Sequence, residues 1–528
     1  MRISTISASL VSMLPVLLLA LAGCAPGGEI PMGAGVCDVP MFVGQTAQPN
    51  PLTPKPIPPH PHLADQGQNG MHSDSYCTGT YPWSGPLGSN PQVTSLSMGL
   101  LGGLVATVAV DTQGRLICVS GGLLGFKLLL LDPDTLQILA SYPLPQRAGM
   151  SEFWRTWDWT VIMSDTSGGA YFHLDNQDRP VIANANKIIQ VFRAVESGGT
   201  FAWQVEEEYD LNEVLPEDAK VTDAMPDWDG RLWFVTPAGI VGIINPANGE
   251  TKTRPLTHLD TEGQTVEEEI QNAMVIAEDG VYIVSDYALY RFERSLADGS
   301  PQWTWREEYD RGTYAKPGAI NQGSGTTPTL LGDELIAITD NADVRVNVLI
   351  YKRLPEVSEN RLVCQVPVFE PNFSVSENSL IGYDRSVIVE NNYLYSTVSP
   401  MDPNPRLHPG VVRIDVDEDL ATCEMMWENT EESSTTVPKL SIGNGLIYLY
   451  TRLQSTPDEI MAWYLTALDF ETGATAFKIF TGTGKHWNNS YAPTTIGPDG
   501  TVYVGVFNGI IAVRDGDEHE PPRDLGCN

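Results

Sequence analysis

Residues Asn488 to Asp515 read NNSYAPTTIGPDGTVYVGVFNGIIAVRD, and this stretch decides the fold. Three short apolar runs are separated by one Asp-Gly and one Asn-Gly turn. Such turns between apolar or alternating runs are the strongest short-range signal for antiparallel strands, because Gly adopts positive φ without steric cost. The stretch therefore predicts three antiparallel strands.

The same pattern recurs upstream at intervals of roughly 45 residues. One upstream unit, residues 221–256, reads VTDAMPDWDGRLWFVTPAGIVGIINPANGETKTRPL and contains four apolar runs. Four short strands per unit, with no helical stretch between them, predict a β-propeller. We count eight blades, with seven as the alternative.

The last unit has three runs only, and an open ring would leave two unpaired sheet edges. We therefore expect an N-terminal strand to close the propeller. The donor segment is predicted either within Gln92 to Met98 or around Val36 to Val43.

Two matching segments support the repeat. Residues 203–210 (WQVEEEYD) and residues 303–310 (WTWREEYD) share their Trp, Glu-Glu, Tyr and Asp positions. An outer strand of this kind alternates an aromatic residue that packs between blades with acids that face water. The acidic triplets Glu206–Glu208 and Glu267–Glu269 are accordingly expected to be solvated rather than catalytic.

The first 24 residues predict export. Met1-Arg2 precedes an apolar segment from Val11 to Leu21, which is too short to span a bilayer but suits a secretory signal. Residues 21–24, Leu-Ala-Gly-Cys, resemble the bacterial lipobox. The resemblance implies that Cys24 is acylated (palmitate-type) and becomes the first residue of the mature chain. Residue 25 is Ala rather than the Asp that retains such proteins at the inner membrane. This favours a location at the outer membrane, on its periplasmic or cell-surface side. An ordinary signal with a chance Cys is the alternative.

These features suggest five segments. They are a signal peptide (1–23), a Pro/Gly-rich tether (24–70), an N-terminal segment packed on the propeller (71–103), the propeller (104–516) and a C-terminal tail (517–528). Proline favours an extended spacer, so His60 and His62 are expected to be solvated. A proline-recognition ligand is the alternative for Pro49 to His62.

Without Cys24, six cysteines remain: Cys37, Cys77, Cys118, Cys364, Cys423 and Cys527. None is spaced as Cys-x-x-Cys, and an even number in an oxidising compartment favours disulfides. We expect Cys364 to pair with Cys423, Cys37 with Cys77, and Cys118 with Cys527, although fifteen pairings are possible.

The formal net charge of −35 limits the partners. It disfavours nucleic acid and anionic headgroups, which would repel the surface. It favours solubility, a saline habitat or cation capture, and the protein is expected to be a monomer.

Residues 490–504 (SYAPTTIGPDGTVYV) and 467–473 (ALDFETG) resemble the pyrroloquinoline-quinone-like propeller repeat, as do residues 326–333 and 435–444 more weakly. The resemblance covers about 106–515. Quinoprotein dehydrogenases of this class hold the quinone against a disulfide between adjacent cysteines. This chain has no Cys-Cys pair and has Phe477 in place of a docking Trp, so the quinone is not expected. Non-catalytic relatives include an eight-bladed outer-membrane lipoprotein that scaffolds protein assembly, which implies a scaffold role and an envelope protein partner.

Chemistry in a propeller is expected at the mouth of its channel, where the inner strands begin. Polar residues at these starts are Asp223, Asn272, Thr326, Asp384, Thr435 and Asn489. A ring of such oxygens suits Ca²⁺, and six-bladed calcium-dependent lactonases and esterases use one. The alternative is that each residue caps a turn.

Two further clusters are candidates. Asp340, Asn341 and Asp343 follow a strand and could bind a cation or cap a turn. His486 precedes the last unit and could act as a general base or be structural. Residues 415–419 (DVDED) lack the Gly and Glu of a calcium loop and are expected to be solvated.

The sequence thus predicts an exported, lipid-anchored propeller that acts as a binding or scaffold protein of the cell envelope. The alternatives are a calcium-dependent hydrolase or lactonase with its site in the channel, and a quinone-dependent dehydrogenase.

Overall fold

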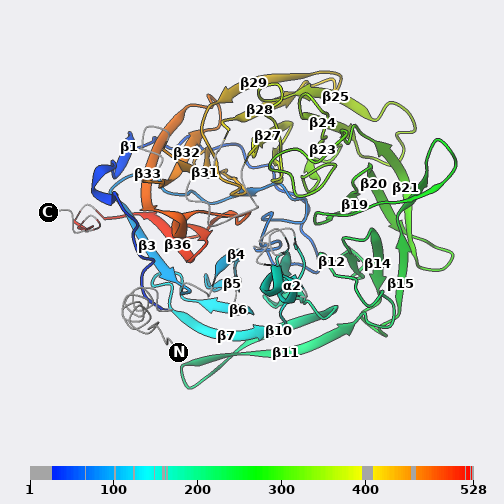
Figure 1. Ribbon diagram of the computed structural model, residues 1–528, viewed down its shortest axis with the longest axis horizontal. Coiled ribbons are helices and arrows are strands. Elements are labelled where there is room, and N and C mark those ends of the chain that lie inside the picture. Colours follow the sequence, from blue (N-terminus) through cyan, green and yellow to red (C-terminus); the bar gives the residue numbers. More distant parts are fainter. Residues whose placement is uncertain are drawn as a thin grey trace, which may run out of the picture.

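The protein is an eight-bladed β-propeller (Figure 1). The structure, a computed structural model, describes residues 27–65, 67–99, 103–122, 125–147, 149–156, 161, 165–394, 408–453, 460–517, 519–521, 523 and 525. The predicted signal peptide, Cys24 and Cys527 lie outside the described residues. The predicted blade number of eight is confirmed.

Each blade is a four-stranded antiparallel sheet whose first strand lies nearest the central axis. From inside to outside, blade 1 contains β4 (Leu104–Val110), β5 (Leu116–Gly122), β6 (Gly125–Leu131) and β7 (Ile138–Leu144); blade 2 contains β8 (Phe172–Leu174), β9 (Pro180–Ala183), β10 (Ile188–Ser197) and β11 (Thr200–Asp210); blade 3 contains β12 (Asp223–Pro226), β13 (Leu232–Val235), β14 (Ile240–Ile244) and β15 (Thr251–Pro255); and blade 4 contains β18 (Val275–Ala277), β19 (Gly280–Val284), β20 (Ala288–Arg294) and β21 (Pro301–Glu308).

The second half continues the ring. Blade 5 contains β22 (Thr329–Leu331), β23 (Leu335–Thr339), β24 (Asn347–Lys352) and β25 (Leu362–Pro367); blade 6 contains β26 (Ile381–Tyr383), β27 (Ser386–Glu390), β28 (Val411–Val416) and β29 (Cys423–Asn429); blade 7 contains β30 (Lys439–Ser441), β31 (Leu446–Arg452), β32 (Ala462–Asp469) and β33 (Thr475–Thr483); and blade 8 contains β34 (Thr494–Ile496), β35 (Val502–Val506), β36 (Gly509–Asp515) and β3 (Pro91–Ser97). A hairpin of β16 (Thr257–Leu259) and β17 (Thr265–Glu267) is inserted after blade 3.

The ring is closed by β3, which pairs with β36 over its whole length, from Pro91 opposite Asp515 to Ser97 opposite Gly509. This confirms the donor predicted within Gln92 to Met98. The other candidate segment contributes β1 (Phe42–Gly44), which instead adds a fifth strand outside β33 of blade 7. Apolar side chains of the blades face one another between neighbouring sheets and form the core.

The two matching segments are outer strands, as predicted. Trp203 lies on β11 and is buried against blade 1, whereas Glu206 to Glu208 on the same strand are exposed. The prediction for the second triplet is wrong in part, because the Glu268 side chain is buried. It accepts hydrogen bonds from Tyr290 and Arg306 at 2.8 and 2.9 Å, so a buried charge is paired.

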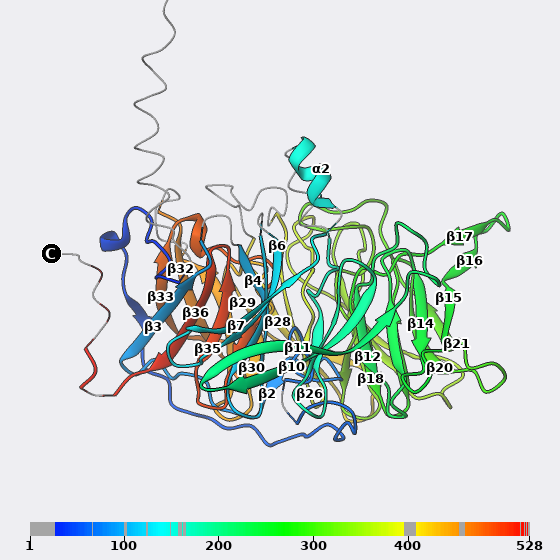
Figure 2. The ribbon, with the colours of Figure 1, turned by 90° about the horizontal axis from the view of Figure 1, so that it is seen from below.

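A helix interrupts the strands, contrary to the prediction of an all-strand repeat. This helix, α2 (Gly149–Thr156), lies between blades 1 and 2. Figure 2 shows α2 projecting from one face of the disc. We call this face the upper face; the inner strands begin at it and run toward the lower face.

Residues 47–64, which contain the Pro-rich stretch, run along the lower face (Figure 2). Backbone hydrogen bonds join Leu52 to Ile442 of blade 7 and Ala64 to Leu174 of blade 2. His60 is 5% exposed, bonds to the Pro226 carbonyl at 3.0 Å and packs on Trp228. The prediction of a free tether with solvated histidines is therefore wrong, because these residues are bound to the blades.

The chain then enters the channel from below. Residues 67–81, which we call the plug, end in β2 (Thr80–Tyr81), a short strand parallel to β30. Backbone carbonyls of the plug accept hydrogen bonds from the inner strands of blades 2, 4, 5, 6 and 7, at Leu174, Ile276, Leu330, Gly382 and Leu440. The plug thus joins five blades at the axis.

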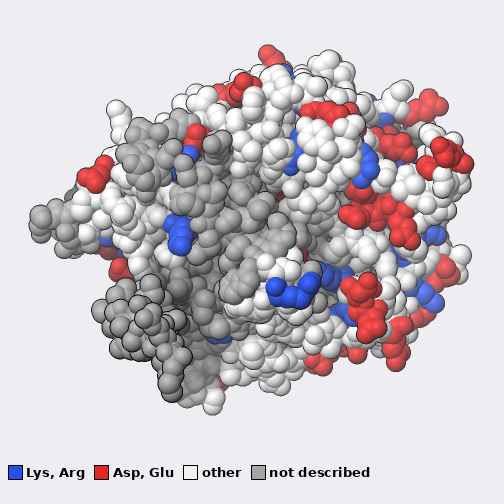
Figure 3. All heavy atoms as spheres, in the orientation of Figure 1, with Lys and Arg blue, Asp and Glu red and all other residues white. Residues whose placement is uncertain are grey.

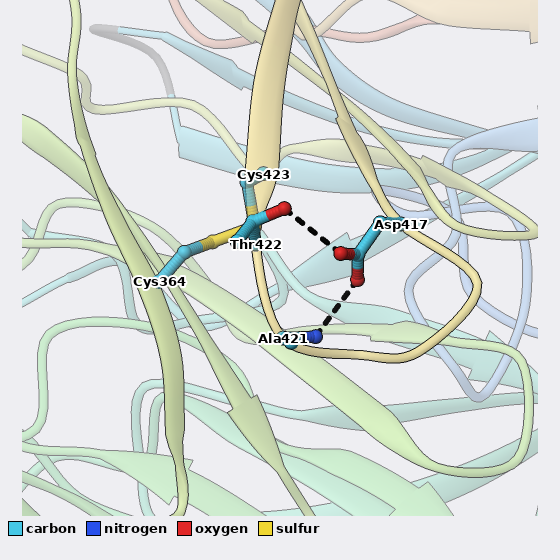
Figure 4. Close-up of a disulfide and its surroundings, with 5 residues drawn as sticks. All are labelled: Cys364, Asp417, Ala421, Thr422 and Cys423. Atoms are coloured by element: carbon cyan, nitrogen blue, oxygen red, sulfur yellow. Dashed lines mark hydrogen bonds between the residues drawn. A yellow bond between two sulfur atoms is a disulfide. The ribbon is translucent and has the colours of Figure 1, made fainter.

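A disulfide between Cys364 of β25 and Cys423 of β29 links the outer strands of blades 5 and 6 (Figure 4), as predicted. Asp417 caps the turn beside it, accepting hydrogen bonds from Ala421 N and Thr422 Oγ1. The other predicted pairs are wrong: Cys77 and Cys118 are buried free thiols. Cys37, in the 3₁₀ turn η1 (Val36–Asp38), is disulfide-bonded to a partner outside the described residues.

The disulfide closes a loop with a sequence separation of 59 residues. Replacing both cysteines, Cys364→Ser with Cys423→Ser, is expected to lower the free energy of unfolding by about 2–4 kcal/mol. Thermal unfolding in the absence of reductant measures the change. The control is Thr422→Ala, which removes a bond to Asp417 and leaves the disulfide; a double variant as stable as the control would contradict a role for the bond.

Leu96 of β3 is buried against blade 8, next to Ile510 and Ala512 of β36. Leu96→Ala is expected to cost about 2–4 kcal/mol of stability, because a buried Leu side chain is lost from the closing strand. Chemical denaturation measures the loss, with the exposed Thr94→Ala on the same strand as control. Equal stability of the two variants would show that β3 does not hold the ring closed.

Candidate functional site

A cavity of about 420 Å³ occupies the upper mouth of the channel. Its walls come from the segments that precede the inner strands of most blades, and its floor comes from Met71 and His72 of the plug. A second cavity of about 350 Å³ adjoins it and shares Asp165, Thr166 and Ile320. Because the plug fills the channel below, the hollow is accessible from the upper face.

The floor presents a buried imidazole. His72 is 2% exposed, and neither of its ring nitrogens has a hydrogen-bond partner among the described residues. Burial, together with the charge of Lys439, lowers the pKa of His72 well below its ordinary value. The ring is therefore neutral near pH 7 and offers one donor and one acceptor. Its neighbour across the floor is the ring of Tyr171, at a centroid distance of 5.7 Å.

One wall carries a carboxyl group and three amides. Glu377 is 8% exposed and accepts hydrogen bonds from Ile320 N at 3.2 Å and Gln271 Nε2 at 3.1 Å. Burial raises the pKa of Glu377 to about 7. Asn272 and Asn378 line the same wall. The side-chain oxygens of Gln271 and Asn378 are buried without a partner among the described residues.

The rim carries cations. Arg147 donates to the Asp165 carbonyl oxygen at 2.6 Å and lies over the Phe126 ring at 4.3 Å. Its Nε is buried without a partner among the described residues. The Asp165 carboxylate is already paired with Lys220 at 2.8 Å. Burial opposes ionisation of Asp165, but Arg147 and Lys220 outweigh it and lower its pKa.

The 3₁₀ turn η2 (Lys485–Trp487), between blades 7 and 8, brings Lys485 and His486 to the rim. Burial lowers the pKa of His486, and the neighbouring Lys485 charge lowers it further. Between the polar groups the lining is apolar, with side chains from Leu104, Met150, Val437 and Phe507. The cavity is thus mostly apolar with a few polar groups at fixed places, which is typical of small-molecule sites.

A second set of ionisable groups lies deeper, where blades 6 and 7 meet the plug. Lys439 of β30 is 1% exposed, and burial lowers its pKa to about 7 despite the opposing effects of Cys77, Asp74 and Glu390. Burial raises the pKa of Glu390 to about 8 and that of Asp74 to about 6. Burial thus shifts all three groups toward their neutral forms, the response expected of charges removed from water.

The residues predicted at the channel mouth separate into two groups. Asn272 and His486 do line the cavity. Asp223 is at the start of β12, where it is 2% exposed and accepts a hydrogen bond from Met274 N at 3.2 Å; burial raises its pKa to about 7. The placement of Asp384 is wrong, because it lies in the turn after β26 on the lower face and pairs with Lys55 at 3.1 Å.

Of the two roles considered for Asp340, Asn341 and Asp343, binding a cation or capping a turn, the hydrogen bonds favour the second. Asp340 accepts hydrogen bonds from Asn347 N at 2.7 Å and Ala342 N at 3.2 Å, and the Asp343 carboxylate accepts one from Thr313 N at 2.7 Å. Asn341 donates to two backbone carbonyls. In the described part of the chain, no three His, Cys, Asp or Glu side chains are grouped as metal ligands.

Sequence reasoning missed the residues that characterise the cavity. Glu377 precedes β26 as Asn272 precedes β18, but the uneven length of the connections hides this equivalence. Arg147 and His72 lie in irregular segments that carry no repeat signal. The sequence did indicate that Lys439 is unusual. It lies within the apolar run VPKLSI, so it must be buried if that run forms an inner strand.

Comparisons with known proteins agree with the fold. A protein of Archaeoglobus fulgidus, itself uncharacterized, is 25% identical over 512 residues, covering 88% of this chain and 92% of the relative. No family model matches the sequence. No helix within the described ranges has the length and apolar character needed to cross a membrane.

Among solved structures, the quinohemoprotein alcohol dehydrogenase of Comamonas testosteroni is similar, with a TM-score of 0.54 and 9% identity over 87% of this chain and 83% of that enzyme. A europium-containing methanol dehydrogenase has a TM-score of 0.48 and 12% identity, over 85% of this chain and 90% of that chain. At this identity the likeness to the alcohol dehydrogenase shows the fold alone, a β-propeller.

The raised pKa of Glu377 predicts a pH dependence of stability. Folded Glu377 keeps its proton up to about pH 7, whereas an unfolded Glu loses it near pH ~4.3. Between these values the folded state binds more protons, so the free energy of unfolding falls as the pH rises. Glu377→Gln should flatten this fall by on the order of 3 kcal/mol between pH 4.5 and 8, at ~1.4 kcal/mol per pKa unit.

Denaturation curves across that range measure the effect. The matched control is Glu424→Gln, an exposed position on β29. A Glu377→Gln profile that parallels both the wild type and this control would show that Glu377 ionises normally.

Proposed function

We propose that this chain is an exported, lipid-anchored binding protein of the cell envelope whose central cavity holds a small organic molecule. The observation that supports this proposal is the cavity itself, which is closed below by the plug and lined mainly by apolar side chains. Three of the residues that line it, His72, Gln271 and Asn378, have buried side-chain polar atoms without a protein partner among the described residues. Buried polar groups are normally paired, so a ligand would supply the missing partners.

The charges at the rim favour an anionic ligand. The protein carries a formal net charge of −35, yet Arg147 and Lys485 lie at the cavity with Lys220 close by. The carboxylate of Asp165 is paired with Lys220, and Glu377 has a pKa of about 7. The larger cavity thus has two cations, Arg147 and Lys485, with Asp165 paired to Lys220, while Asp218 and Glu269 line the smaller cavity beside it. A guanidinium matches a carboxylate with two parallel hydrogen bonds.

The size and lining of the cavity favour an apolar body on that ligand. A volume of about 420 Å³ lies in the ordinary range for small-molecule sites. Phe126, Met150 and Phe507 would contact the body of the molecule, while Arg147 would bind its acidic group.

An envelope protein partner is the second candidate role, as the sequence resemblance implies. Exposed apolar side chains on the outer strands of blades 5 and 6 favour it: Leu362 is 44% exposed, and Met425 and Met426 are 37% and 49% exposed. These three residues lie on β25 and β29. The disulfide joins these two strands and so fixes the geometry of the surface.

The residues that could bind a calcium ion or a quinone give less support to the two enzymatic alternatives. A calcium hydrolase needs several oxygen ligands around one point, whereas Asp340, Asn341 and Asp343 already bond to backbone groups. A quinone held against adjacent cysteines would need sulfur at the cavity, and the described lining residues include no Cys.

Binding of a matched pair of probes tests the proposal. We expect 2-naphthoate to raise the melting temperature, and the uncharged 2-naphthamide to have a much smaller effect. Arg147→Gln should weaken naphthoate binding about tenfold or more, because a charge-assisted hydrogen bond contributes about 1.5–3 kcal/mol. Isothermal titration calorimetry measures both affinities.

The control variant is Arg193→Gln, which removes an arginine paired with Glu206 on the outer surface of blade 2. The proposal would be contradicted if the amide bound as well as the acid, or if both arginine variants lost binding equally.

A further inference from the structure

The described chain begins at the upper face. Gly27 N donates to the Ser97 carbonyl at 2.9 Å, and Ser97 N donates back to Gly28 O. Ser97 ends β3, and the next residue, Met98, bonds to Asn508 in the upper turn between β35 and β36. Asn508 N in turn donates to the His486 carbonyl. The first described residues, Gly27 and Gly28, therefore lie beside the rim of the cavity.

This position limits the distance to a lipid anchor. Cys24 precedes Gly27 by three residues. An extended chain spans at most about 3.3–3.6 Å per residue, so Cys24 lies within ~10 Å of the Gly27 position. The 47 residues expected to form a long tether (24–70) do not provide that reach, because residues 47–64 and the plug are bound to the blades.

The same face carries exposed apolar side chains. In each blade the turn between the second and third strands, and the connection to the next blade, lie on the upper face. Among the described residues, the large apolar side chains exposed there are Trp154 (46%), Val214 (40%), Leu259 (69%), Tyr314 (50%), Val344 (59%) and Phe373 (37%). They are distributed over the first six blades.

The helix α2 makes this face uneven. It is the part of the described chain that projects furthest from the disc near the cavity (Figure 2), and Trp154 and Arg155 are exposed on it. Tryptophan is enriched where a protein meets the headgroup region of a bilayer, because its ring is apolar and its N–H can bond to water or headgroups.

We propose that the upper face, with the mouth of the cavity, docks on a lipid surface. The inference rests on the lipid anchor in the proposed function and adds the orientation of the propeller to it. Figure 3 shows this face: acidic side chains gather along its edge over blades 3 and 4, and basic ones lie nearer the centre. The acidic edge would be repelled by anionic headgroups, so the surface fits a bilayer of zwitterionic lipids.

The orientation has a consequence for the ligand. The plug closes the channel from the lower face, so a molecule enters the cavity from the space between the propeller and the bilayer. A molecule with an apolar body and an acidic group partitions to that interface, where its acidic group faces water.

Fluorescent labels on opposite faces test the orientation. The mature, acylated chain carrying Trp154→Cys is labelled with an environment-sensitive dye and reconstituted on phosphatidylcholine vesicles. The matched control is Leu296→Cys, a 95% exposed position in the turn between β20 and β21 on the lower face. We expect the label at position 154 to shift to the blue and to be quenched by headgroup-labelled lipid, and the label at 296 to remain as in solution.

The outcomes are distinct. Equal signals at both positions, or a larger change at position 296, would overturn the proposed orientation. Adding phosphatidylglycerol at low salt should reduce the signal at position 154, and an increase would contradict the charge argument. Mass spectrometry of the mature N-terminus is the check on the anchor: an unacylated Cys24 overturns the orientation and the anchor, while naphthoate binding, measured without vesicles, still decides the binding role.

Discussion

The pairing of β3 with β36 is the constraint on which the structure depends. A propeller blade buries its two faces against neighbouring blades, so a ring with a missing outer strand exposes apolar surface and an unpaired edge. Here the chain starts on one blade, crosses the lower face, fills the channel and then supplies the strand that completes blade 8. Closure, the channel floor and the position of the N-terminus are consequences of one continuous path.

That path explains why the site has its shape. Of the side chains of the plug, those of Met71 and His72 line the upper mouth, and its backbone carbonyls accept hydrogen bonds from five inner strands. The channel thereby becomes a cavity with one open end. Polar groups that face it, such as Glu377 and His72, are removed from water, and burial shifts their pKa values toward the neutral forms. Arg147 and Lys485 then remain as the cations of the lining, and the Asp165 carboxylate is paired with Lys220.

The repeat made the fold predictable from the sequence, whereas the positions of the irregular segments were not predictable. Gly and Asp-Gly turns at fixed intervals identify blades, and the missing run in the last unit implies a closing strand. The disulfide between Cys364 and Cys423 followed from their equivalent places in successive units. The bound state of residues 47–64 did not follow, because proline favours an extended backbone whether or not it is packed. The sequence could not decide whether Asp and Asn residues in turns bind a cation or cap the turn. Asp340 caps a turn, and its hydrogen bonds in the folded structure show this.

The central claim is that residues 67–97 are an integral part of the propeller, closing both its ring and its channel. Hydrogen–deuterium exchange of the full chain measures this directly, because exchange reports the free energy of local opening. The account predicts that amides of β3 are protected as strongly as those of β35 and β36, and that inner-strand amides bonded to the plug, such as Leu330, share this protection. Fast exchange at these positions, while the outer strands stay protected, would contradict it.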